Sequence, residues 1–109
     1  MNRMDKIEDL LHKEIANIIL TRIDNPEIKN TVTITDIKIS KDIRTGIVYF
    51  TTLNDNYKKI EETINSLKPV IKYHLAKNVH LKRIPDIKFI FDDTNLKAQK
   101  INKLIDSLK

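Results

Sequence analysis

Residues 32–55 read VTITDIKISKDIRTGIVYFTTLND, in which two β-rich runs flank a polar turn. The runs cover residues 31–40 and 47–53 and are dominated by the β-branched and aromatic residues that strands favour. Between them, residues 40–46 include turn-forming residues, and Gly46 is free to adopt positive φ. The pattern predicts an antiparallel pair of strands joined by this turn.

The first run breaks the two-residue period of a strand, because its apolar side chains step from Ile34 to Ile37. A β-bulge near Thr35 and Asp36 would restore the alternation. Apolar residues on both faces of the strand would explain the pattern equally well. The sequence leaves both alternatives open.

Amphipathic helices are predicted on both sides of the strand pair. Before it, apolar residues recur at helical spacing until Asp24, Asn25 and Pro26 end the helix. After it, residues 54–56 offer a helix cap, and two more apolar stripes follow. The three stripes are Ile7, Leu10, Leu11, Ile15, Ile18 and Ile19; Tyr57, Ile60, Ile64 and Leu67; and Val70, Ile71, His74 and Leu75.

A proline separates the second and third stripes. Within a helix, proline removes a backbone hydrogen bond, clashes with the preceding turn and costs about 3 kcal/mol. It suits the first turn of a new helix, however. The sequence therefore predicts a kink or a restart at Leu67, Lys68 and Pro69.

A third strand follows Pro85, where Ile87, Phe89 and Phe91 alternate along the chain. Phe89 and Phe91 share a strand face, as base-stacking aromatics do in some RNA-binding sheets, but packing against helices is the preferred interpretation. Asp93 or Thr94 is expected to cap a last helix with its apolar side chains inward: Leu96, Ile101, Leu104, Ile105 and Leu108. The predicted order is αββααβα, in a single α+β domain over residues 1–109.

The composition excludes several classes of protein. A chain of 109 residues with 40% apolar side chains can bury one core. With a single glycine it has no phosphate-cradling glycine loop, hydrolase nucleophile elbow or GxxG clamp for RNA backbone. The lack of cysteine excludes disulfides and fits a reducing compartment. Since no segment reads as a signal peptide or a membrane span, we expect a cytoplasmic protein.

The chain is basic, with 20 lysines and arginines against 15 acidic residues. Residues 63–85, called here the basic stretch, contain no acidic side chain but hold Lys68, Lys72, Lys77, Lys82 and Arg83 together with His74 and His80. Such a stretch favours contact with a polyanion such as RNA. The alternative is that these cations only solvate the outer face of a helix.

No arrangement of residues points to catalysis or to a metal ion. None of the three histidines has the two-histidine helical spacing of a metal site; His74 is expected to be partly buried, and His80 to touch RNA or lie on a loop surface. Adjacent strand residues such as Asp92 and Asp93 face opposite ways, which favours capping and solvation over acid–base chemistry. Ser40-x-Asp42 suits a turn, without a nearby histidine to activate the serine.

Together these segments resemble the ribosome-binding factor A family, over residues 3–108. The first helix carries the family's pattern as EIANII at 14–19 and its proline motif as IDNPEI at 23–28. The hairpin quoted above is the closer match, including the Ser-x-Asp turn at Ser40 and the Val48-Tyr49 pair. Residues 67–94, LKPVIKYHLAKNVHLKRIPDIKFIFDDT, are similar to the family's kinked helix pair, basic connection, proline-led strand and acidic strand end.

The resemblance implies a KH-like domain of type II, with a three-stranded mixed sheet packed on helices and an Ala-x-Gly kink in place of the GxxG loop. Leu67 and Pro69 stand where the family usually has alanine and glycine, and Ala76 where glycine is common. Lys72 stands where arginine is typical; it keeps the charge but lacks the planar fork that binds phosphate through two hydrogen bonds. Proline can still bend the helix pair.

By resemblance, the expected function is to bind the immature 30S subunit and its 16S rRNA and to promote late maturation, 5′-end processing of the rRNA and cold adaptation. Adjacent ribosomal proteins are further candidate partners. We expect a monomer that is not an enzyme, with no cofactor, metal, membrane or small-molecule substrate. The expected RNA-binding residues are Lys68, Lys72, Lys77, His80, Lys82 and Arg83. Two alternatives are a basic protein-interaction or dimerisation module without RNA contact, and a small hydrolase.

Overall fold

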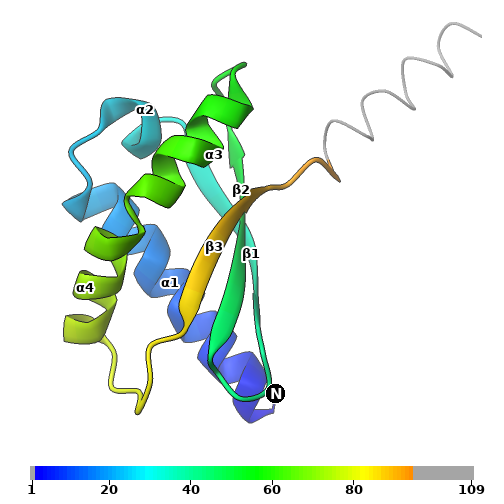
Figure 1. Cartoon of the computed structure of the whole chain (residues 1–109), viewed down its shortest axis with the longest axis vertical. Helices are drawn as coiled ribbons and strands as arrows, with labels where there is room; N and C mark the ends of the chain where they lie inside the picture. The colour runs from blue at the N-terminus through cyan, green and yellow to red at the C-terminus, as the bar shows by residue number, and fades with distance from the viewer. Residues whose placement is uncertain (1, 95–109) are drawn as a thin grey trace, which may run out of the picture.

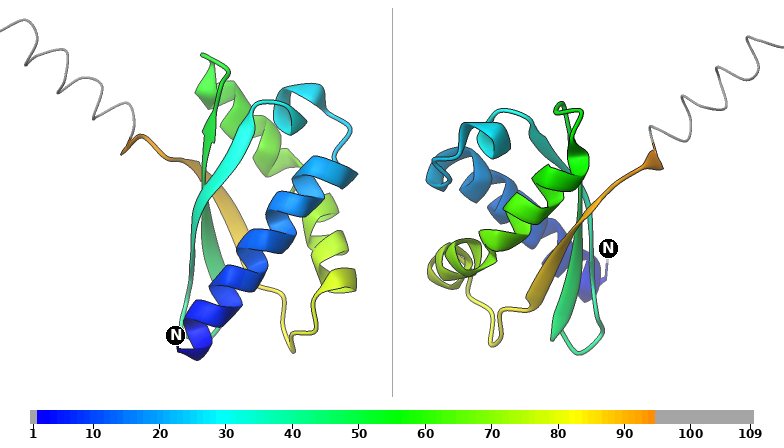
Figure 2. Two further views of the ribbon diagram at one scale, coloured as in Figure 1. Left: turned by 180° about the vertical axis from the view of Figure 1, so that it is seen from behind. Right: turned by 45° about the horizontal axis from the view of Figure 1, so that its top comes forward.

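The computed structural model describes residues 2–94, in which a three-stranded sheet carries helices on one face (Figures 1 and 2). The elements follow in the order α1 (Arg3–Arg22), α2 (Pro26–Lys29), β1 (Val32–Ile39), β2 (Thr45–Thr52), α3 (Tyr57–Ser66), α4 (Lys68–Asn78) and β3 (Asp86–Phe91). This confirms the predicted α+β order through the third strand, apart from the additional short helix α2. The predicted last helix lies outside the described residues.

The sheet is mixed, in the order β1-β2-β3. Strands β1 and β2 pair antiparallel, whereas β2 and β3 pair parallel. The register of the hairpin shifts between Ile34 and Asp36, which confirms the bulge. Because of the bulge, Ile34, Ile37 and Ile39 all face the core, and apolar residues on both faces are not needed to explain the pattern.

Helix α1 begins with a capping box in which the Asn2 side chain accepts from the Asp5 amide at 2.8 Å. It ends at Arg22, just before the predicted stop. The same stop starts α2, a one-turn helix that the periodicity did not predict. The Asn25 side-chain oxygen accepts from the Glu27 amide at 2.9 Å, and Pro26 occupies the first turn.

The predicted interruption at Leu67, Lys68 and Pro69 is confirmed. Helix α3 ends at Ser66 and α4 restarts at Lys68, with Leu67 between them at φ −92° and ψ 2°. Pro69 lies in the first turn of α4, where its missing amide has no helical partner to lose. The chain therefore changes direction between two short helices without breaking a hydrogen bond of either.

The prediction that Gly46 adopts positive φ is wrong. Gly46 lies inside β2, opposite Ile39, and the residue with positive φ is Ile43, at 60°. Side chains close the turn instead of a glycine: the Asp42 carboxylate accepts from the Arg44 amide at 3.1 Å, and the Ser40 hydroxyl accepts from the Thr45 amide at 3.1 Å. A left-handed backbone at a β-branched residue costs about 1–3 kcal/mol, which the partial burial of the Ile43 side chain offsets.

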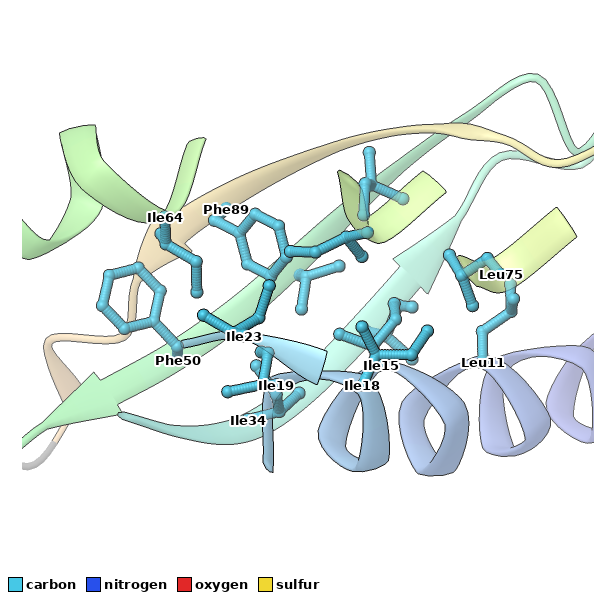
Figure 3. Packing of buried hydrophobic residues seen from close by; sticks show 14 of the residues in the cluster. Leu11, Ile15, Ile18, Ile19, Ile23, Ile34, Phe50, Ile64, Leu75 and Phe89 are labelled. Atoms are coloured by element: carbon cyan, nitrogen blue, oxygen red, sulfur yellow. The ribbon is translucent and has the colours of Figure 1, made fainter. Parts of the chain in front are cut away.

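The core lies between the sheet and the helices and consists mostly of isoleucine (Figure 3). Its largest fully buried side chains are Phe50 and Phe89, which confirms Phe89 as a packing residue. Phe91 is half-buried, with its ring stacked on Tyr57 at 4.4 Å between centroids. The predicted apolar stripes are wrong at Leu10, Tyr57 and Val70, which are 39%, 36% and 42% exposed.

Candidate nucleic-acid interface

The first group of cations surrounds the joint between α3 and α4. Lys68, Pro69 and Lys72 line a pocket of about 350 Å³ together with the first residues of β3, Asp86 and Ile87. Lys72 Nζ donates to Asp86 Oδ1 at 2.6 Å. This hydrogen bond, the charge of Lys72 and then the charge of Lys68 hold the pKa of Asp86 below its ordinary value. Asp86, the first acidic residue after the basic stretch, therefore forms an ion pair with a lysine of that stretch.

The second group lies at the other end of α4, in the connection to β3. His80, Lys82 and Arg83 share a pocket of about 470 Å³ with Arg3, at the start of α1, and Arg44, in the hairpin turn. We call this the end pocket. Figure 1 shows the N-terminus, the hairpin turn and the α4–β3 connection together at this end of the molecule. Its apolar lining is formed by Ile7, Ile43 and Leu81.

Asp42 is the carboxylate that lines the end pocket. It accepts from the Ser40 hydroxyl at 2.8 Å, and its other oxygen lies 3.6 Å from Arg44 Nε. The Ser40 hydrogen bond is the main reason why the pKa of Asp42 is below its ordinary value, followed by the hydrogen bond from the Arg44 amide. Asp42 therefore stays charged and orients Arg44, while the pocket as a whole remains cationic.

Lys77 belongs to neither group. Its ammonium lies 4.5 Å from the centroid of the Tyr73 ring, one turn earlier on α4. Tyr73 is 55% exposed and meets the half-buried His74 edge to face, at 5.2 Å between ring centroids. The outer face of α4 thus presents an aromatic ring with a cation against it.

The predicted RNA-binding residues thus lie in two separate groups, with Lys77 outside both. Lys68 and Lys72 lie together at the joint, and His80, Lys82 and Arg83 lie together in the end pocket. Sequence reasoning missed Arg3 and Arg44, which are far from the basic stretch in the chain. No local signal marked them, because only the packing of the hairpin turn and α1 brings them to this end.

The remaining candidate residues have structural roles. Ser40 and Asp42 close the hairpin turn, as expected. Asp92 accepts from the Thr94 amide at 3.0 Å and from the Thr35 hydroxyl at 2.8 Å. Within residues 2–94, no cluster of three or more histidine, cysteine or acidic side chains is placed to hold a metal ion. No helix in the same range is long and apolar enough to cross a membrane.

A mixed sheet in the order β1-β2-β3, with a helix–kink–helix in place of a glycine loop, defines a KH-like domain of the α-first type. Comparison with known proteins then gives the family. The chain belongs to the ribosome-binding factor A family, whose model matches residues 3–105.

Relatives match along nearly the whole chain. Ribosome-binding factor A of Legionella pneumophila strain Lens is 29% identical over 97% of this chain and 86% of its own length. The protein of that name from Buchnera aphidicola of Acyrthosiphon pisum, strain Tuc7, is 33% identical over 98% of this chain and 93% of its own.

Solved structures confirm the fold. The crystal structure of ribosome-binding factor A from Thermus thermophilus has a TM-score of 0.73 at 19% identity, covering 82% of this chain and 96% of that one. The solution structure of a ribosome-binding factor A candidate from Thermotoga maritima has a TM-score of 0.71 at 29% identity, covering 83% and 90%. A Thermus thermophilus homology model fitted into a cryo-EM map of a 30S complex has a TM-score of 0.67 at 19% identity, covering 80% and 92%.

Proposed function

We propose that this protein binds the immature small ribosomal subunit through its rRNA and promotes late maturation without cutting RNA itself. The family match over residues 3–105 is the observation that carries the proposal. It is supported by the Thermus thermophilus relative, which was fitted into a map of a 30S complex. The finer roles in 5′-end processing of 16S rRNA and in cold adaptation, in the cytoplasm, belong to the same proposal.

The charges of the basic stretch support contact with RNA backbone. Of its five lysines and arginines, Lys72 is the one that forms an ion pair within residues 2–94. Lys77 lies against the Tyr73 ring. Lys68, Lys82 and Arg83, which form no ion pair in this range, support contact with an external polyanion. Phe89 is buried and Phe91 half-buried against Tyr57, so the sheet offers no pair of exposed phenylalanines for stacking bases. Recognition therefore rests on charge and shape, as in other contacts to folded RNA.

Charge reversal tests the proposal. Lys82→Glu with Arg83→Glu should reduce co-sedimentation with immature 30S subunits at least tenfold and lower the log–log salt slope by about 1.4–1.8, because each lost phosphate contact removes about 0.7–0.9. Lys38→Glu with Lys88→Glu is the matched control. It changes the net charge equally, at exposed positions of β1 and β3 that alternate with core residues.

Equal losses in the two double variants would show that only net charge matters. Undiminished binding in both would favour the protein-interaction module. Incubation of the purified protein with precursor 16S rRNA tests the hydrolase alternative: we expect intact RNA, and specific cleavage would contradict the proposal.

Asp86 gives a test with the opposite sign. Its carboxylate accepts a hydrogen bond from Lys72 Nζ at 2.6 Å. Because Asp86→Asn removes this ion pair, it should free Lys72 to bind phosphate and increase affinity for the subunit two- to fivefold. Asp24→Asn, in the exposed connection before α2, removes the same charge elsewhere and should change affinity less. Weaker binding by the Asp86→Asn protein would show that the ion pair holds α4 in the binding geometry instead of competing with RNA.

A further inference from the structure

We infer that the end pocket holds a single unpaired nucleotide of the bound RNA, with its phosphate on the arginines and its base on the apolar wall. The inference rests on the proposed function and deepens it, because it names the chemical group that the pocket accepts. Its volume of about 470 Å³ is in the range of small-ligand sites. A flat cationic surface would offer phosphate contacts without room for a base.

The charge of the pocket suits a phosphodiester. Four cationic side chains line it, against the single carboxylate of Asp42: Arg3, Arg44, Lys82 and Arg83. Asp42 lies 3.6 Å from Arg44 Nε, so it holds one edge of that guanidinium. A planar guanidinium can bind phosphate through two hydrogen bonds from its other nitrogens.

The apolar lining suits a nucleobase. Ile7, Ile43 and Leu81 come from α1, the hairpin turn and the α4–β3 connection. Ile43 is held in this lining with φ at 60°, a conformation that β-branched residues rarely adopt. Sequence-specific RNA recognition commonly takes bases splayed out of single-stranded loops, which stack on aromatic rings or guanidinium planes. The end pocket offers the His80 ring and arginines for such stacking next to its aliphatic lining.

Hydrogen bonds between distant segments hold two of the walls, α1 and the hairpin turn, in place. The Glu8 carboxylate accepts from the Ile39 amide at 2.7 Å, which joins α1 to the end of β1 beside the turn. The Asp86 amide donates to the Arg44 carbonyl at 2.9 Å, which joins the turn to the start of β3. The walls formed by α1 and the hairpin turn are therefore in place before RNA arrives, and binding does not have to order them.

The test uses the full chain and three probes at one salt concentration: a short unstructured RNA, the same strand with an abasic site at each position, and free nucleoside monophosphates. Arg44→Gln should weaken binding of the RNA at least fivefold. Lys41→Gln, an exposed neighbour that does not line the pocket, removes the same charge and should weaken it less than twofold. Equal losses in the two variants would overturn the inference.

Ile43→Asn separates the base from the phosphate. Asparagine tolerates left-handed φ, so the turn should keep its shape while the pocket loses apolar surface. This variant should lose affinity for the intact RNA and keep its affinity for the abasic strand. A thermal unfolding midpoint close to that of the parent protein confirms folding. Equal losses for both strands would show a site for phosphate alone and overturn the inference.

Free monophosphates distinguish the source of the ligand. Because neighbouring phosphates add to the contacts of one residue, we expect the RNA to bind at least tenfold more tightly than any monophosphate. Tighter binding of a free nucleotide would overturn the assignment to RNA. Co-sedimentation with subunits distinguishes failure of this inference from failure of the proposed function. If the Arg44→Gln protein co-sediments and binds the short RNA as the parent protein does, only the inference about the pocket is contradicted. If the parent protein itself fails to co-sediment, the proposed function is contradicted.

Discussion

The single glycine of the chain is required for close packing and not for a turn. A Cβ atom on Gly46 would lie 2.5 Å from Ile39 Cδ1 and 3.4 Å from the Lys38 carbonyl oxygen. The first of these atoms is the end of a flexible side chain, so part of the overlap can be relieved by a change of rotamer. The cost of a methyl group at position 46 should therefore depend on residue 39.

Gly46→Ala should lower the free energy of unfolding by about 1–3 kcal/mol, as overpacking of a core does. Ile39→Val removes the clashing Cδ1 and by itself should cost about 0.5–1.5 kcal/mol. In the double variant, most of the cost of the alanine should disappear, which urea unfolding of the four proteins of the cycle measures. An unchanged cost of Gly46→Ala in the Ile39→Val background would assign it to the backbone of β2.

At the scale of elements, side chains from the helices close both edges of the sheet. On β3, the Asn65 amide group accepts from Phe89 N and donates to Phe89 O, each at 2.9 Å. Glu61 accepts from the Phe91 amide at 2.8 Å. On β1, Glu8 and His12 reach the backbone of Ile39 and Ile34. These contacts orient α3 and α1 and reduce the tendency of exposed edges to pair with other chains.

Asn65→Ala should remove two hydrogen bonds from the edge of β3 and lower the free energy of unfolding by about 1–3 kcal/mol, because partly buried backbone groups lose their partners. Sedimentation should also show more self-association. Asn17→Ala, at an exposed position of α1, is the control; alanine favours the helix there and should not destabilise. If Asn65→Ala lowers the free energy of unfolding no more than the control does, water fully replaces the hydrogen bonds of the Asn65 amide group.

For the whole molecule, among the carboxylates that join distant segments or close tight turns, three aspartates have a lowered pKa. Asp42 closes the hairpin turn, Asp86 joins β3 to α4, and Asp92 joins the end of β3 to the bulge of β1. Hydrogen bonds hold the pKa of each below its ordinary value, mainly from Ser40, from Lys72 and from Thr94 respectively. The folded state therefore favours their charged forms.

A lowered pKa in the folded state stabilises the protein above the ordinary value of 3.8 and loses that stabilisation as the pH falls through the folded-state pKa. Asp92→Asn should therefore destabilise at neutral pH, and its difference from the parent protein should shrink below pH 3.8. Urea unfolding over this range measures the difference. A difference that does not depend on pH would show that hydrogen-bond geometry matters at Asp92 and charge does not; Asp24→Asn controls for net charge.

The sequence by itself determined the elements through β3 except α2, the hairpin, the interruption at Pro69 and the resemblance to the family, and it left the bulge as one of two alternatives. Periodicity, caps and proline act over a few residues, so a linear pattern contains them. Only the tertiary structure decided that Ile43 takes the left-handed conformation, that Asp86 forms an ion pair with Lys72, and that Arg3 and Arg44 line the end pocket with Lys82. These outcomes depend on how distant segments pack, because a side chain's charged neighbours are set in space and not by its position along the chain.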